Sequence, residues 1–217
     1  MTHLTEPPAT QASTVTVGVG SLAESTGPVL EAVPVRRWAV LDCETTGLID
    51  PRIVEVALVR SDGRVLLDQI VNPGVPIPAA VVAIHGIDDA AVADAPTWAT
   101  VHPRLLAALE GIDVVYAYNA PFEALCLAAE GTPAAFDLRC AYDASVRALG
   151  NVAPPGSGSL ASACERAGVA VVPTHRAVDD CLATVALLWS VQPEDLGLLR
   201  SLATRLTPRP AATPGER

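Results

Sequence analysis

The sequence predicts an α/β fold in which a mixed five-stranded sheet is flanked by helices. Three apolar segments joined by short turns come first, at 38–42, 53–60 and 65–71, and their order indicates an antiparallel meander. Helical and strand segments then alternate, which is typical of parallel strands joined by helices. A hydrophobic fraction of 50% in 217 residues is enough for one domain with a substantial core.

The meander is defined by its turns. The apolar run that begins at Trp38 is expected to be a buried strand, and Ser61-Asp-Gly63 is the kind of Asp-Gly turn that joins antiparallel strands. The sequence Asn72-Pro-Gly ends the strand pattern. After it, 78–85 is expected to be a loop and 88–95 a short helix.

The second half of the domain is predicted from the spacing of its apolar residues. We expect helices at 97–109, 120–129, 141–149, 160–167 and 178–190, strands at 112–117 and 135–138, and a loop rich in proline and glycine at 151–158. Because a helix separates the two strands, their connection is a crossover, and the strands are expected to be parallel.

Both ends of the chain are expected to lie outside the folded domain, which we place at 35–192. Residues 1–34 mix Thr, Ser, Pro, Gly and Glu without periodicity and predict a flexible tail, and 193–217 predicts a partly flexible extension. Neither a run of roughly 18 apolar residues nor a signal-peptide pattern is present. The sequence therefore predicts a cytoplasmic protein without membrane contact.

The charge of the chain limits how it can bind nucleic acid. A net charge of -10 argues against a protein that holds a long duplex, because that mode needs a basic face. An enzyme that holds only a chain end stays compatible with this charge, since divalent cations can supply positive charge locally. The five cysteines contain no Cys-x-x-Cys pair and are predicted to be reduced packing residues.

Acidic side chains follow the predicted strands and begin the predicted helices. Residues two apart on a strand project to one face, so Asp42 and Glu44 are expected to point together. Glu123 lies in the first turn of a helix after a strand, and Asp180 begins the last helix. Since ligand sites in open α/β sheets form outside the carboxyl ends of strands, these acids could converge on one crevice. Clustered carboxylates attract hard divalent cations, so magnesium or manganese is the expected occupant.

The predicted cluster suits two-metal phosphodiester hydrolysis. In that chemistry one ion activates a water molecule and the other stabilises the leaving 3′ oxygen. A general base must still accept the proton of the water. His175 is the candidate, because imidazole titrates near neutrality and because this histidine lies in a loop, after Pro173 and Thr174.

Three motifs in fixed order resemble those of the DEDDh, or DnaQ-like, 3′-to-5′ exonucleases. They are Asp42-Cys-Glu-Thr-Thr-Gly47, Tyr118-Asn-Ala-Pro-Phe-Glu123 and His175-Arg-Ala-Val-Asp-Asp180. Segments 52–57, 84–87 and 92–96 add to the similarity, which is greatest to exonuclease X and to the proofreading subunit of bacterial replicative polymerase (polymerase III). Three ordered motifs over roughly 37–191 are a much stronger signal than any one of them.

The resemblance implies an RNase H-like fold and a specific set of site residues. It implies two Mg²⁺ or Mn²⁺ ions held by Asp42, Glu44, Glu123 and Asp180, with catalytic roles for His175 as the base and for Glu44 near the 3′ hydroxyl. Asp180 fits better than Asp179, because the family places its histidine five residues before its last aspartate. The implied substrate-binding residues are Thr45, Thr46, Gly47, His85 and Asn119. The implied reaction is release of 5′-mononucleotides from a 3′ end, of DNA in preference to RNA, with a role in DNA repair and a polymerase or repair partner.

Two departures from the family pattern leave alternatives open. The family normally has aspartate at the position of Glu123 and usually histidine at that of Tyr118. The extra methylene of Glu123 displaces a carboxylate, so a slower or more manganese-dependent enzyme is expected. The alternatives are a catalytically weakened RNase H-like module that binds a polymerase or repair partner, and a 3′-to-5′ exoribonuclease. For His85, a structural role is the commoner one for a lone histidine in a turn.

Overall fold

The computed structural model describes residues 37–150 and 158–191. The predicted tails at 1–34 and 193–217, and nearly all of the predicted loop at 151–158, lie outside the described residues. The described strands are β1 (Trp38–Thr45), β2 (Ile53–Arg60), β3 (Val65–Ile70), β4 (Val114–Ala117) and β5 (Leu138–Cys140). The described helices are α1 (Ala79–His85), α2 (Asp89–Val92), α3 (Trp98–Ala108), α4 (Ala120–Ala129), α5 (Ala141–Leu149), α6 (Leu160–Arg166) and α7 (Ala177–Val191).

The five strands form one mixed sheet in the order β3-β2-β1-β4-β5. Strand β1 pairs antiparallel with β2, and β2 pairs antiparallel with β3, as the Asp-Gly turn predicts. On its other side β1 pairs parallel with β4, which in turn pairs parallel with β5. The predicted meander and the predicted crossover are both confirmed, and β1 occupies the centre of the sheet.

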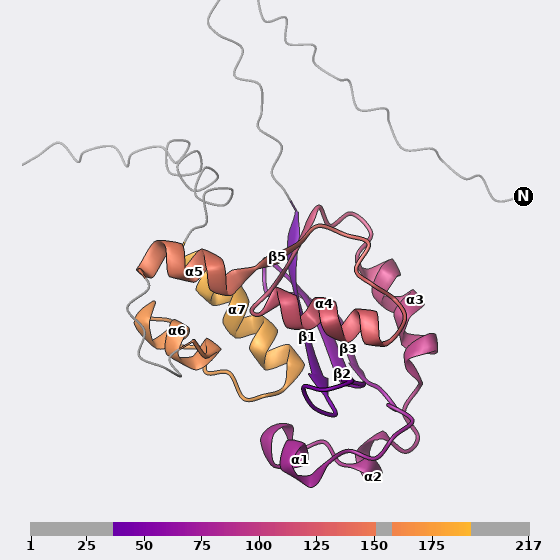
Figure 1. Ribbon diagram of the computed structural model, residues 1–217. Helices are drawn as coiled ribbons and strands as arrows, with labels where there is room; N and C mark the ends of the chain where they lie inside the picture. Colours follow the sequence, from indigo (N-terminus) through magenta and orange to yellow (C-terminus); the bar gives the residue numbers. More distant parts are fainter. Residues whose placement is uncertain (1–36, 151–157, 192–217) are drawn as a thin grey trace, which may run out of the picture. The chain divides into compact units, whose positions relative to one another are not determined.

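The side chains of β1 alternate between two hydrophobic clusters, one on each face of the sheet. Trp38 and Val40 pack with residues of α5 and α7, whereas Leu41 and Cys43 pack with residues of α3 and α4. Trp38 is 2% exposed and meets the ring of Trp189 at 5.6 Å. Helices α5, α6 and α7 lie together in Figure 1, where α7 runs alongside the strands. The alternation on β1 therefore decides which face of the sheet each acid after Leu41 can occupy.

Several elements differ from the sequence-based expectation; the helix expected at 88–95 is only Asp89–Val92, and the strand expected at 112–117 is Val114–Ala117. Segment 78–85 contains a helix, α1, between Pro78 and a left-handed Gly86 whose N–H donates to the carbonyl of Val82. Strand β1 runs past Asp42 to Thr45, because its pairing with β2 continues to Ile53. Strand β5 lies at Leu138–Cys140 and not at 135–138, because it is at Leu138 that the pairing with β4 begins.

The described cysteines match their predicted role. All five are free, and four of them are buried: Cys43, Cys126, Cys164 and Cys181. Every helix within 37–150 and 158–191 is too short or too polar to cross a bilayer.

Candidate active site

The central strand places two acids on the face that α7 covers. Leu41 and Cys43 belong to the cluster under α3 and α4, so Asp42 and Glu44 project to the opposite face, as predicted. Both acids are half-buried near the end of β1. They therefore share one face of the sheet and one opening to solvent.

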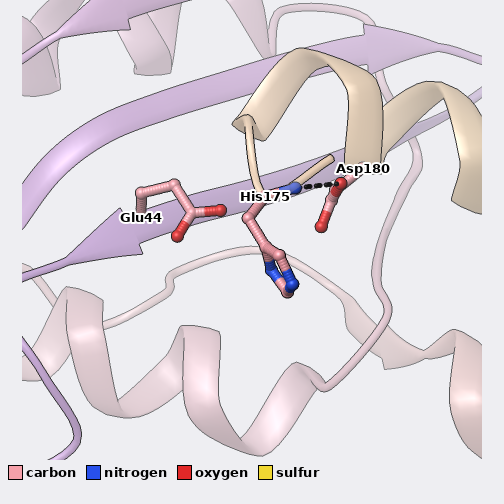
Figure 2. Close-up of side chains that lie close together, drawn as sticks. All are labelled: Glu44, His175 and Asp180. Atoms are coloured by element: carbon pink, nitrogen blue, oxygen red, sulfur yellow. Dashed lines mark hydrogen bonds between the residues drawn. The ribbon is translucent and has the colours of Figure 1, made fainter. Parts of the chain in front are cut away.

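The first turn of α7 brings a third acid to the same place. Asp180 is 8% exposed, and its Oδ1 accepts hydrogen bonds from the backbone N–H groups of Thr174, at 3.0 Å, and His175, at 3.2 Å. Figure 2 shows Glu44 from β1 beside His175 and Asp180, with the His175 side chain extending from the segment that enters α7. Ligand atoms of these three residues all lie within 4.8 Å of one another.

His175 has an unusual backbone conformation. Its φ of 58° lies in the left-handed region, which is uncommon outside glycine, although asparagine, aspartate and histidine adopt it more often than other residues. Its side chain is exposed, so the ring is accessible to solvent beside the acids. The neighbouring Asp179 is half-buried and accepts a hydrogen bond from the Thr174 hydroxyl, which places it outside the cluster of ligand atoms that includes Asp180.

Glu123 approaches from the other helix layer. It lies in the first turn of α4 and is 3% exposed. The Cys43 thiol donates a hydrogen bond to its carboxylate, and its Oε2 is buried without a hydrogen-bond partner. Burial is the main reason that the pKa of Glu123 rises from 4.5 to about 8, and the charge of Glu44 adds to it. A buried, unpartnered carboxylate oxygen near other acids is what a site for a cation requires.

The acids raise one another's pKa. For Asp42, burial raises the pKa well above its usual value, and the charges of Glu123, Asp180 and Glu44 raise it further. Burial also raises the pKa of Glu44 to about 7, with a contribution from Asp180. The pKa of Asp180 is raised by burial despite its two backbone N–H donors. A divalent cation would relieve this repulsion, so the donor set fits the Mg²⁺ or Mn²⁺ that the family implies.

The turn after Glu44 is held by its own hydrogen bonds. The Thr45 hydroxyl donates to the Gly47 carbonyl at 2.9 Å, and the Thr46 hydroxyl accepts from the Arg52 N–H at 3.0 Å. Gly47 has a φ of 146°, where a side chain would be strained even though an added Cβ would meet no atom within 4 Å. Thr45, Thr46 and Gly47, which are predicted to bind substrate, therefore form an ordered loop at the edge of the site.

His85 lies behind this loop and makes structural contacts. It is 4% exposed; its Nε2 lies 3.2 Å from the Thr45 carbonyl, and its Nδ1 accepts from the Ile87 N–H at 3.0 Å. Because Nδ1 is an acceptor, the proton belongs on Nε2, which donates to Thr45. Both ring nitrogens thus have hydrogen-bond partners, and through Thr45 the His85 side chain supports the loop 45–47.

Asn119 and Tyr118 begin the second motif. The Asn119 carbonyl accepts from the N–H groups of Phe122 and Glu123, but the Asn119 side chain is exposed and makes no capping hydrogen bond. The Tyr118 hydroxyl donates to the Gly158 carbonyl at 2.8 Å, and its ring meets that of Tyr142 edge-on. Tyr118 therefore connects α4 to the start of α6.

One residue of the site was missed by the sequence analysis. Glu55 lies directly opposite Glu44 in the pairing of β1 with β2 and is 1% exposed. It accepts hydrogen bonds from the Arg176 guanidinium and from the Ala177 N–H. The sequence did contain a signal for it, since Glu55 is a charged residue inside the otherwise apolar run that forms Ile53–Arg60. A buried carboxylate of this kind requires a partner.

Comparison with known proteins finds related sequences and a related structure. The model of the Exonuclease family, RNase_T, matches residues 39–188. A DNA polymerase III subunit epsilon-like protein of Rhodobacter capsulatus is 47% identical over 94 residues, which are 40% of this chain and 13% of that protein. A putative bifunctional exonuclease/endonuclease protein of Mycobacterium tuberculosis is 32% identical over 170 residues, which are 71% of this chain and 26% of that protein. The chain thus spans far less than two thirds of either relative.

A solved structure shows the same fold over nearly its full length. It is exonuclease X in complex with 5′-overhanging duplex DNA, with a TM-score of 0.61 and 27% identity, covering 73% of this chain and 96% of that one. The mixed five-stranded sheet with flanking helices is therefore the RNase H-like fold of the exonucleases, as the motifs imply.

Proposed function

Because the chain belongs to the Exonuclease family and is a nuclease, we propose that it removes mononucleotides from the 3′ end of nucleic acid. The observation that best supports this proposal is the meeting of ligand atoms of Glu44, His175 and Asp180 within 4.8 Å of one another. Asp42 and Glu123 lie outside that group, but the charge of Glu44 raises the pKa of both. Such a site is compact enough for one terminal phosphodiester.

We assign the carboxylates of Asp42, Glu44, Glu123 and Asp180 to holding two divalent ions, Mg²⁺ or Mn²⁺. When bound, such ions supply a nucleophilic water at neutral pH and stabilise the charge of the leaving oxygen. The protein contributes a fixed array of oxygen donors. Asp180 is oriented by two backbone N–H groups, and the unpartnered Oε2 of Glu123 is available for an ion or for its bound water.

His175 is the proposed general base. Its exposed ring can accept the proton of the attacking water at an imidazole nitrogen and release it to solvent. The backbone of His175 is fixed by its bond to Asp180, so the ring starts from a defined position beside the acids. Glu44, which lies within the same cluster, is placed to orient the 3′ end of the leaving nucleotide.

The loop at 45–47 is the proposed seat of the terminal nucleotide. The hydrogen bond from Thr45 to Gly47, and the support from His85 beneath the loop, fix its backbone before substrate arrives. Preorganisation of this kind lowers the entropic cost of holding a substrate in a reactive geometry. In this assignment His85 acts through Thr45, and Asn119 acts through its carbonyl at the start of α4.

We propose DNA as the preferred substrate. The support is indirect: the similar solved structure is described as a complex with duplex DNA, and the curated relative is named for a DNA polymerase subunit. A polymerase or repair protein is the proposed partner on the same grounds. Matched DNA and RNA strands in one competition assay would test the preference, and equal or faster loss of the RNA would contradict it.

The decisive experiment uses one nucleic-acid strand, prepared once with a label at its 5′ end and once with a label at its 3′ end. A 5′-labelled strand should shorten one nucleotide at a time in Mn²⁺ or Mg²⁺, and mass spectrometry should identify 5′-monophosphates. EDTA and Asp42→Asn should each abolish the reaction. Internal cuts, or shortening from the 5′ end, would contradict the proposed direction.

A second candidate function is a non-catalytic module that binds a polymerase or repair protein. The observation that favours it is Glu123, which stands where the family has aspartate and is hydrogen-bonded to Cys43. The same assay separates the two, because a module would leave the strand intact at every metal concentration.

A further inference from the structure

The segment that enters α7 is held between two carboxylates that belong to different elements. On one side, Asp180 accepts the N–H groups of Thr174 and His175. On the other, Glu55 of β2 accepts the Ala177 N–H at 2.9 Å. The side chain of Arg176, between these residues, also binds Glu55, with Nε 3.1 Å from both carboxylate oxygens.

This arrangement differs from a surface ion pair because its carboxylate is buried and fully hydrogen-bonded. Glu55 is buried, and three hydrogen bonds from Arg176 and one from Ala177 converge on its two oxygens. Hydrogen bonds to a charged group are among the stronger ones in proteins, and a buried charge that loses its partner is costly. The link spans 121 residues of sequence and connects α7 directly to β2.

The link also flanks a residue in a left-handed conformation. His175 has a φ of 58°, which is uncommon outside glycine even though histidine adopts it more readily than most residues. The two carboxylates bind the residues on both sides of His175. Asp180 binds Thr174, and Glu55 binds Arg176 and Ala177. Glu55 is directly opposite Glu44 on the neighbouring strand, so the link fixes the distance between His175 and the acids of β1.

We propose that Glu55 and Arg176 are positioning residues that hold His175 and Asp180 against Glu44. This inference rests on the proposed function for its kinetic consequence, although the positioning itself is a property of the fold. Neither side chain touches the reacting atoms in this proposal. Their contribution is to keep the base and one metal ligand in register with the central strand.

The chain offers a matched control. Arg52 binds the buried Glu130 in the same way, with Nε at 3.0 Å and Nη2 at 2.7 Å, and Glu130 likewise accepts a backbone N–H, that of Ile53. The side chains of Arg52 and Arg176 are 42% and 49% exposed. Arg52 contacts Thr46 only through backbone atoms, which Arg52→Met retains.

The test compares Arg176→Met with Arg52→Met in the full chain. We expect Arg176→Met to lower kcat at least tenfold with little change in KM, and Arg176→Lys to recover part of the loss. Arg52→Met should lose a similar amount of stability but less than twofold in kcat. Glu55→Gln is the second variant if Arg176→Met does not fold, and the same split between kcat and KM is expected.

Amide hydrogen exchange provides a measurement that needs no nuclease activity. The N–H groups of Thr174 and His175 should exchange at least tenfold faster in Arg176→Met than in Arg52→Met. Equal exchange and equal kcat in the two variants would overturn the positioning proposal. A wild-type protein that cleaves no strand would instead refute the proposed function, and the exchange comparison would still decide the positioning.

Discussion

Burial of Glu123 is expected to make the stability of the metal-free protein depend on pH between 4.5 and about 8. The pKa of this residue is raised from 4.5 to about 8, chiefly by burial. Below pH 4.5 both the folded and the unfolded chain hold this proton. Between 4.5 and 8 the unfolded chain releases the proton while the folded chain keeps it, so stability falls as pH rises through this window.

The size of the effect follows from the shift. Each pKa unit corresponds to about 1.36 kcal/mol, so a rise from 4.5 to about 8 removes on the order of 5 kcal/mol of stability once the pH exceeds 8. This is comparable with the whole stability of many domains, roughly 5–15 kcal/mol. Asp42 and Glu44 have pKa values shifted in the same direction and add to the loss.

Glu123→Gln removes the titration of Glu123 and, with it, the charge that helps to raise the pKa of Asp42. The amide oxygen of glutamine can still accept the Cys43 thiol, but the variant has no proton to release. Free energies of unfolding from urea titrations in EDTA, at intervals from pH 5 to pH 8, should fall less steeply for the variant, by roughly 1 kcal/mol per pH unit or more. The buried amide can lower the stability of the variant by a constant amount, so the slope is the quantity to compare.

Addition of a divalent metal should have the opposite effect on the free energy of unfolding. Mn²⁺ at pH 8 should restore stability to the wild type and much less to Asp42→Asn, because ion binding favours the ionised carboxylates. Parallel profiles for wild type and Glu123→Gln in EDTA would refute the reasoning, since they would mean that Glu123 titrates alike in the folded and unfolded chains.

Three further predictions concern the proposed site. Glu123→Asp should raise Mg²⁺-supported turnover roughly tenfold, since it removes the extra methylene, and unchanged rates with both metals would show that the longer side chain is no handicap. His175→Ala should lower kcat about 10²- to 10⁴-fold while Mn²⁺ still stabilises the fold, and wild-type turnover would exclude it as the base. His85→Phe should cost about 1–3 kcal/mol in a urea titration, because it leaves the Ile87 N–H unsatisfied; a neutral result would argue against the structural role of His85.

The sequence was sufficient for the antiparallel meander because local patterns determine it. Continuous apolar runs predict strands buried on both faces, and the Asp-Gly turn at Gly63 fixes one antiparallel pair. The alternation of Asp42 and Glu44 with Leu41 and Cys43 likewise follows from strand geometry alone. These features depend on neighbours in sequence, so they could be derived without the structure.

The helix α1 could not be distinguished from a loop in the same way. Ala79–His85 is a short segment in which adjacent valines lower helix propensity, and Val75 and Pro78 precede it without a side-chain cap. The helix is completed by Gly86 and by burial of His85 under the Thr45 loop. That burial is a long-range contact, which a local pattern does not reveal.

The contacts of Glu123 and Glu55 are long-range as well. Only the folded chain shows that Glu123 reaches the Cys43 thiol while leaving Oε2 without a partner. The pair of Glu55 with Arg176 joins residues 121 positions apart. A motif can name the acids of a site, but the groups that orient those acids depend on which strand lies beside which helix.

Strand β2 contains none of the proposed metal ligands, yet it holds the helix that supplies one of them to the acids of β1. Glu55 of β2 binds the start of α7, the helix whose first turn holds Asp180. Arg52 and the N–H of Ile53 also bind a carboxylate, but theirs is Glu130, which lies at the far end of α4, about two turns from Glu123. Since β2 also pairs with β1 along its length, a shift of this strand would move Asp180 and the acids of β1 together. The precision of the site therefore depends on Glu55, a buried carboxylate that is not itself a proposed ligand.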